Sequence, residues 1–311
     1  MKAAALVVLF VMTVHGVVGS DTSDQTAEFR LIVEDGDFDQ DLDSGHIAVR
    51  IDGTARRVLA VEPERTAVNW LLLVDVSLSS TRGMRVGQTI LVHDFAGNVR
   101  AIERGFVERL PPTDRLLVSR FAGPQFWRHG AFSMDREVQR AAVRGLVTPV
   151  EPGYGIGPSP IWDAVASAAR LLAPEERQRA IVLFTDGHAS GNVLALIDAA
   201  AESVRHDVPV FVMQELFWGE GTNADFRWGQ GETVLRRLAT STGGMFRVND
   251  APKRFGWRDP LPDYGHFIDA MQRRHTVHVD VTGLASGRYD LKVEPRREGL
   301  TVHKPEWIWV R

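Results

Sequence analysis

The sequence predicts an α/β protein with a doubly wound, mostly parallel sheet, helices on both faces, and small β segments at both ends of the chain. Nearly unbroken apolar runs at 70–74 and 180–185 are typical of strands that are buried on both faces. Between and beyond them, short apolar strands alternate with amphipathic helices, such as the one expected at 161–172. That alternation is typical of a parallel sheet covered by helices.

Composition excludes several classes of protein. The chain has 311 residues, of which 44% are hydrophobic, enough for one large domain or two modest ones. Its net charge of -4, with no block of Lys or Arg, argues against nucleic-acid binding. It has no cysteine, whereas a eukaryotic secreted domain of this size usually carries disulfides. A bacterial origin therefore fits better.

The N-terminus predicts export. Lys2 precedes an apolar stretch at 3–14 that is too short for a membrane span, and small residues at 17–20 allow cleavage. An uncleaved anchor is the alternative. No second apolar run is long enough to cross a bilayer, so we expect no membrane span after signal removal. The expected location is secreted or periplasmic.

The chain divides into four expected segments. Residues 1–20 form the signal peptide, 21–66 an N-terminal β segment, 67–250 the main domain, and 251–311 a linker, a helix and a C-terminal β-hairpin module. The acidic run at 34–43 lacks the spacing of a calcium-binding loop and is expected to be a solvated turn.

Three local expectations can be checked against the structure. Residues 57–61 are expected to return as a strand after the Asp52-Gly53 turn. Residues 84–98 are expected to begin a helix, with an inserted loop as the alternative. Ser133 is expected to cap a helix that runs to about Leu146.

Polar side chains occur at three turns of the main domain. Asp75, Ser77 and Ser79 follow the first buried strand, Ser159 precedes a helix, and Asp186 follows the second buried strand. The carboxyl ends of parallel strands share one edge of a sheet, so these side chains can meet there. Carboxylates and hydroxyls without His or Cys suit Mg²⁺, Mn²⁺ or Ca²⁺ and disfavour Zn²⁺.

The order of these motifs resembles a von Willebrand factor type A (VWA) domain with a metal-ion-dependent adhesion site (MIDAS). The resemblance covers about 69–250. It implies a binding module rather than an enzyme, with a cation held by five residues and completed by a carboxylate of a protein ligand. The implied roles are hydroxyl ligation by Ser77, Ser79 and Ser159, and charge balance, partly through water, by Asp75 and Asp186. The β segments at both ends are similar to a bacterial secreted VWFA-related group first noted in acidobacteria.

The sequence departs from the family pattern at three positions. Leu78 replaces a Gly and is expected to crowd the loop backbone. Ser80 replaces a Met, and Ser159 replaces a Thr and lacks the methyl group that fixes the rotamer. All five oxygen ligands are kept, but the strength of metal binding stays open.

Two other functions stay open. A metal-assisted hydrolase would need a general base, for which His188 is the obvious candidate. A structural envelope protein would carry a degenerate metal site. Asp163 is expected to fix its loop rather than bind metal, and Trp218, Phe226 and Trp228 either line a ligand rim or pack their loop onto the sheet.

Overall fold

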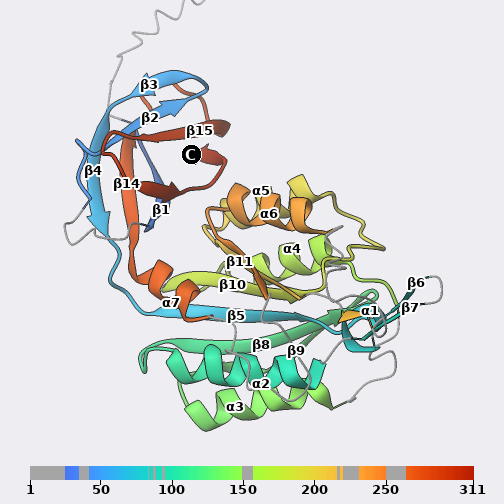
Figure 1. Cartoon of the computed structure of the whole chain (residues 1–311). Helices are drawn as coiled ribbons and strands as arrows, with labels where there is room; N and C mark the ends of the chain where they lie inside the picture. The colour runs from blue at the N-terminus through green and yellow to red at the C-terminus, as the bar shows by residue number, and fades with distance from the viewer. Residues whose placement is uncertain are drawn as a thin grey trace, which may run out of the picture.

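The computed structural model describes residues 25–34, 42–82, 84–86, 89–92, 95–148, 157–215, 218–219, 231–249 and 264–311. They form an α/β domain and a β-sandwich (Figure 1). The expected signal peptide lies outside these residues. In the part of the chain described, no helix combines the length and the apolar character that a bilayer span requires.

A six-stranded sheet forms the centre of the α/β domain. Its strands lie in the order β13–β11–β10–β5–β8–β9. The first five run parallel to one another, and β9 runs antiparallel to β8. The strands are β5 (Val68–Asp75), β8 (Arg115–Ala122), β9 (Gln125–Ser133), β10 (Gln178–Thr185), β11 (Val210–Glu215) and β13 (Phe246–Asn249).

Helices pack against both faces of this sheet (Figure 1). All of β5 is buried, because alternate side chains enter two different cores. Trp70 and Leu72 pack with α2, α3 and α7, whereas Leu71 and Leu73 pack with α4, α5 and α6. The helices are α1 (Leu78–Arg82), α2 (Phe95–Gly105), α3 (Arg136–Arg144), α4 (Ile161–Leu172), α5 (Leu196–Arg205), α6 (Glu232–Ser241) and α7 (Gly265–Gln272).

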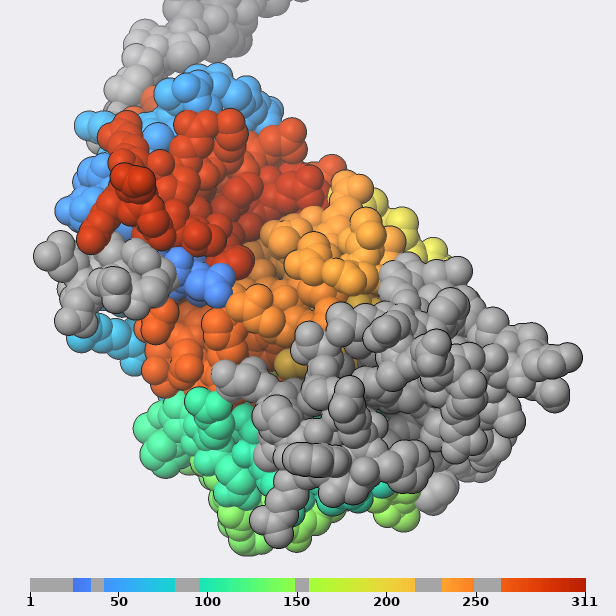
Figure 2. All heavy atoms as spheres, viewed as in Figure 1, coloured from blue at the N-terminus to red at the C-terminus, as the bar shows by residue number. Residues whose placement is uncertain are grey.

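The two ends of the described chain build the β-sandwich together. One antiparallel sheet has the order β16–β1–β14–β4 and the other β17–β15–β2–β3. Side chains from both sheets, including Phe29, Val49, Val277 and Ile308, form one core. Figure 2 shows the blue N-terminal and red C-terminal segments side by side on the surface. The strands are β1 (Thr26–Glu34), β2 (Ile47–Ile51), β3 (Thr54–Arg56), β4 (Val58–Pro63), β14 (Arg274–Asp280), β15 (Gly287–Pro295), β16 (Thr301–His303) and β17 (Trp307–Val310).

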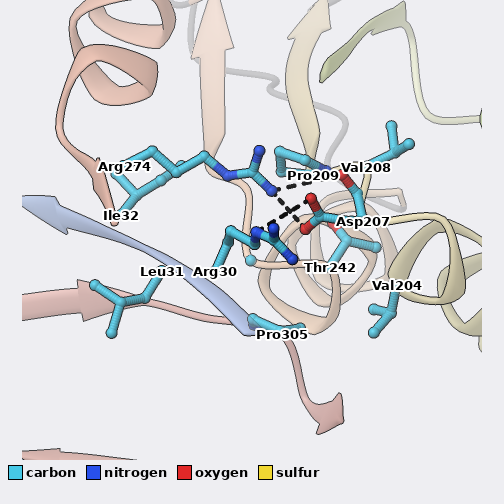
Figure 3. A pocket seen from close by; sticks show the side chains of 11 residues that line it. Arg30, Leu31, Ile32, Val204, Asp207, Val208, Pro209, Thr242, Arg274 and Pro305 are labelled. Carbon is cyan, nitrogen blue, oxygen red and sulfur yellow. Dashed lines mark hydrogen bonds and ion pairs between the residues drawn. The ribbon is translucent and has the colours of Figure 1, made fainter. Parts of the chain in front are cut away.

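An ionic cluster joins the sandwich to the α/β domain (Figure 3). Arg274 on β14 is buried and donates to Asp207 Oδ1 at 2.6 Å and to Glu64 Oε2 at 3.3 Å. Arg30 on β1 donates to Glu64 Oε1 at 3.1 Å and lies 3.5 Å from Asp207 Oδ2. Figure 3 shows both guanidinium groups directed at the Asp207 carboxylate. Because Asp207 precedes β11, these contacts fix how the two parts meet.

The predicted α/β class is confirmed, with sheets of mixed kind. Among the described residues, parallel pairs occur in the six-stranded sheet, and the sandwich sheets pair antiparallel. A separate small antiparallel sheet contains β12 (Trp218–Gly219), β7 (Thr89–Val92) and β6 (Met84–Val86). The expected C-terminal hairpin takes a different form, because β14 and β15 lie in different sheets and pair with N-terminal strands.

Three local predictions were wrong. Residues 84–86 and 89–92 form β6 and β7, since β-branched residues at 86, 89, 90 and 92 favour strands. Ser133 ends β9, and Asp135 caps α3 by accepting from Glu137 N at 2.8 Å. The return strand after β2 is β3, whereas β4 pairs with β14 in the other sheet.

Candidate metal site

The structure brings the predicted ligands together at the carboxyl edge of the six-stranded sheet. Asp75 is the last residue of β5, Asp186 directly follows the neighbouring strand β10, and Ser159 lies just before α4. After β5 the chain adds β8 on one side and later β10 on the other, so the site lies where the strand order reverses. Open α/β sheets bind ligands at such points.

Asp75 is the centre of a buried hydrogen-bond network. Its Oδ2 accepts from Ser159 Oγ at 2.6 Å and from Thr185 Oγ1 at 2.7 Å. Its Oδ1 accepts from the backbone N–H of Ser77 at 2.9 Å. Ser77 Oγ lies 3.3 Å from Ser79 Oγ. Four of the five predicted ligands are therefore joined by direct hydrogen bonds.

The fifth ligand, Asp186, interacts with Asp75 through its charge. Asp186 Oδ1 accepts from the backbone N–H of His188 at 2.8 Å, whereas the buried Oδ2 has no hydrogen-bond partner. Burial, followed by the negative charge of Asp186, raises the pKa of Asp75 to about 6. Hydrogen bonds from Ser159 and Ser77 oppose this rise. Two carboxylates thus share a buried space in which ionising both is unfavourable.

These residues fit a hard divalent cation. An orphaned carboxylate oxygen and two mutually repelling carboxylates mark a place where positive charge is missing. The surrounding hydroxyls are oxygen donors, as Mg²⁺ and Ca²⁺ require. The described residues contain no group of three or more His, Cys, Asp or Glu side chains that could hold a metal. A cation site here would therefore depend on Ser hydroxyls as well as carboxylates.

Reciprocal hydrogen bonds hold Ser159 in place. Its backbone N–H donates to Ser190 Oγ at 3.1 Å, and the Ser190 N–H donates back to the Ser159 carbonyl at 2.8 Å. Asp163, expected to fix its loop, does so by accepting from the N–H groups of Val193 and Leu194, both at 2.8 Å. The preceding glycine-rich arm, 153–156, lies outside the described residues.

The departures from the family pattern have clear structural outcomes. Leu78 is the first residue of α1 and is 45% exposed. Ser80 is buried, and its hydroxyl has no hydrogen-bond partner. A buried hydroxyl without a hydrogen-bond partner lowers the stability of the fold. The Met of the VWA pattern has no hydroxyl at this position and so avoids that energetic cost.

Two participants were missed from the sequence. Thr185 donates to Asp75 and accepts from Gly187 N at 3.1 Å, although its position beside Asp186 was a usable signal. Ser190 carries no local signal, because its partner lies 31 residues away. His188, the candidate base, is exposed and meets the site through its backbone N–H. Phe226 and Trp228 lie outside the described residues, and the side chain of Trp218 is not described.

Comparison with known proteins gives matches among solved structures. No family model and no curated protein matches this sequence. An aerotolerance-related membrane protein from Bacteroides fragilis is 20% identical, with a TM-score of 0.47, and the match covers 67% of this chain and 98% of that one. BatB, a conserved hypothetical protein from Bacteroides thetaiotaomicron, is 20% identical at a TM-score of 0.43, covering 58% and 90%.

A third match is a von Willebrand factor type A protein from Catenulispora acidiphila. It is 13% identical with a TM-score of 0.43, and the match covers 93% of this chain and 74% of that one. All three TM-scores lie below 0.5.

Proposed function

We propose that this chain is an exported bacterial VWA-domain protein that binds a protein ligand through a divalent cation at a MIDAS-type site, without catalysing a reaction. The main domain would be a doubly wound VWA sheet, and the whole protein would belong to the secreted VWFA-related group. The expected cation is Mg²⁺, with Mn²⁺ or Ca²⁺ as substitutes. The expected location is secreted or periplasmic.

One observation carries this proposal. Asp186 Oδ2 is buried without a hydrogen-bond partner, beside an Asp75 whose pKa is raised by the same carboxylate. A buried carboxylate oxygen without a partner is costly unless a cation or a donor reaches it. Three hydroxyls converge on the same space. This arrangement suits cation binding better than it suits a packed core.

Each residue of the proposed site would have a distinct role. Ser77, Ser79 and Ser159 would present hydroxyl oxygens, and Asp75 and Asp186 would supply the negative charge. Thr185 holds Asp75 in position by donating to Oδ2, which leaves Oδ1 to the Ser77 N–H. When bound, the cation would supply a positive charge to which the carboxylate of an Asp or Glu side chain of the ligand can bind.

Metal titration tests the site. Calorimetric titration of Mn²⁺ and Mg²⁺ into wild type and Asp75→Ala should show binding to wild type alone. Metal-dependent capture of a partner from the native envelope, abolished by EDTA and by Asp75→Ala, would support the binding function. Metal binding without capture would favour a structural envelope role, and substrate turnover would favour a hydrolase. Equal titration curves for both proteins would refute the site.

A further inference from the structure

The loop of residues 190–194, here the Val193 loop, is fastened to the start of α4 at several points. Ser190 exchanges two hydrogen bonds with Ser159. Asn192 Oδ1 accepts from the N–H of Trp162 at 2.7 Å. Asp163 accepts from the N–H groups of Val193 and Leu194. The backbone of this loop is therefore fixed by its own side chains and those of α4.

This fixed backbone holds Val193 in solvent. The side chain is 91% exposed, whereas the next most exposed large apolar residue described, Met134, is 54% exposed. Its neighbour Leu194 packs against a core cluster. Isolated exposed apolar side chains are common on protein surfaces. Val193 differs because hydrogen bonds hold the backbone of the loop that presents it.

Val193 lies close to the candidate metal site. It is three residues beyond Ser190, which is hydrogen-bonded to the ligand residue Ser159. Three extended residues span about 11 Å at most. Leu78, the first residue of α1, stands between the predicted ligands Ser77 and Ser79 and is 45% exposed. Two apolar side chains thus lie near a pair of buried carboxylates that would bind a cation.

We propose that Val193 and Leu78 are the apolar contacts that select the ligand: a protein segment in which an Asp or Glu is next to an apolar side chain. The inference rests on the proposed cation site, which would take the carboxylate. The apolar neighbour would cover Val193, with Leu78 as the second apolar contact. A preorganised loop binds at low entropic cost, and apolar contacts around a desolvated charge pair exclude water.

A peptide library tests this selection. Phage-displayed peptides with one fixed Asp and randomised flanks are selected on the full chain in Mg²⁺, and the bound pool is eluted with EDTA. The EDTA-eluted peptides should be enriched in apolar residues next to the Asp. The best peptide should bind Val193→Ser about tenfold more weakly than wild type, because truncation of a central contact commonly has effects of this size.

Two further variants test whether weaker peptide binding by Val193→Ser results from the loss of the Val193 contact. Val138→Ser removes an exposed valine on α3 and should leave peptide affinity unchanged. Asp163→Ala removes the acceptor of two loop N–H groups but keeps Val193. It should also lower the affinity for the peptide. Mn²⁺ affinity should be the same in Val193→Ser and wild type.

Two results would overturn the inference. EDTA-eluted peptides with no apolar preference, or equal binding by Val193→Ser and wild type, would show that these side chains do not select the ligand. In either case metal-dependent binding itself would stand. If no peptide is eluted by EDTA and Mn²⁺ does not bind, the cation site fails and this inference fails with it.

Discussion

At the scale of single residues, Asp75 and Asp186 oppose stability and favour cation binding. Both are buried, and the charge of Asp186 raises the pKa of Asp75 to about 6. The metal-free protein is thus less stable with both groups ionised, because the folded state holds a proton more tightly than the unfolded chain. A cation reverses this by stabilising the doubly ionised form.

Asp186→Asn should separate these two effects. The amide keeps an oxygen for the His188 N–H but removes the charge beside Asp75. We expect the metal-free variant to be as stable as wild type or about 1 kcal/mol more stable. Its Mn²⁺ affinity should fall by about 100-fold or more. Urea denaturation in EDTA and Mn²⁺ calorimetry measure the two quantities.

The exposed Asp269 provides the control, because Asp269→Asn removes the same charge away from the site. It should leave Mn²⁺ affinity unchanged. An Asp186→Asn protein that keeps wild-type Mn²⁺ affinity would contradict the assignment of Asp186 as a ligand.

Thr185→Val should weaken the fold through two lost hydrogen bonds. The hydroxyl donates to Asp75 Oδ2 and accepts from the N–H of Gly187, and both partners are buried. Valine fills the same volume but leaves the Gly187 N–H unpaired and removes one of the two hydroxyl donors to Asp75 Oδ2, which keeps Ser159. We expect a cost of about 2 kcal/mol. Denaturant midpoints measure the loss. Thr185→Ser keeps the hydroxyl and should recover most of it, and a valine variant as stable as wild type would exclude this role.

At the scale of elements, the predictions that succeeded rest on strong periodicity. Helix α4 spans Ile161–Leu172 as expected, because its apolar stripe recurs at helical spacing. Strands β5 and β10 were predicted from unbroken apolar runs. Strand β9 was missed, since it is an edge strand with a bulge opposite β8 and much of it is exposed.

Strand order explains which parts of the candidate site could be predicted from the sequence. Asp75 and Asp186 end adjacent parallel strands, so their proximity follows from topology alone. The contacts of Thr185 and Ser190 could not be predicted, because hydroxyl partners depend on loop geometry that strand order does not determine.

One side chain joins the beginnings of two neighbouring strands. Asp114, just before β8, accepts from Val68 N at 3.0 Å and from Trp70 Nε1 at 2.8 Å, both in β5. Asp114→Ala would leave the buried indole N–H unpaired, so we expect a loss of about 2–3 kcal/mol in the free energy of unfolding. In Trp70→Phe, which has no such N–H, the same Asp114 substitution should cost less. Strictly additive losses would show that the indole contact contributes nothing.

At the scale of the whole molecule, the α/β domain is inserted into the sandwich. The chain enters it from β4 and leaves it through α7 into β14, and β4 and β14 are neighbours in one sheet. Both connections therefore start from adjacent strands, on the sandwich side of the molecule. The ionic cluster of Arg30, Glu64, Asp207 and Arg274 lies at this junction.

Glu64 makes this junction sensitive to acid. Burial alone would raise its pKa, but the charge of Arg274, a hydrogen bond from Thr276 Oγ1 at 2.8 Å, and Arg30 together lower it. A carboxylate with a lowered folded pKa stabilises the protein above the unfolded pKa, and this contribution disappears as pH falls through the folded pKa. We therefore expect Glu64→Gln to cost roughly 2 kcal/mol near neutral pH.

The difference between wild type and Glu64→Gln should then shrink as the pH is lowered from about 6 to about 3, where the carboxylate of the unfolded chain becomes protonated. Urea denaturation of both proteins across this range measures the difference. Glu62→Gln, which removes an exposed carboxylate two residues away, should have little effect at any pH. A Glu64→Gln penalty that stays constant across the range would mean that Glu64 holds the junction by packing. A penalty that disappears in acid would mean that ionised Glu64, paired with two arginines, holds the sandwich against the α/β domain.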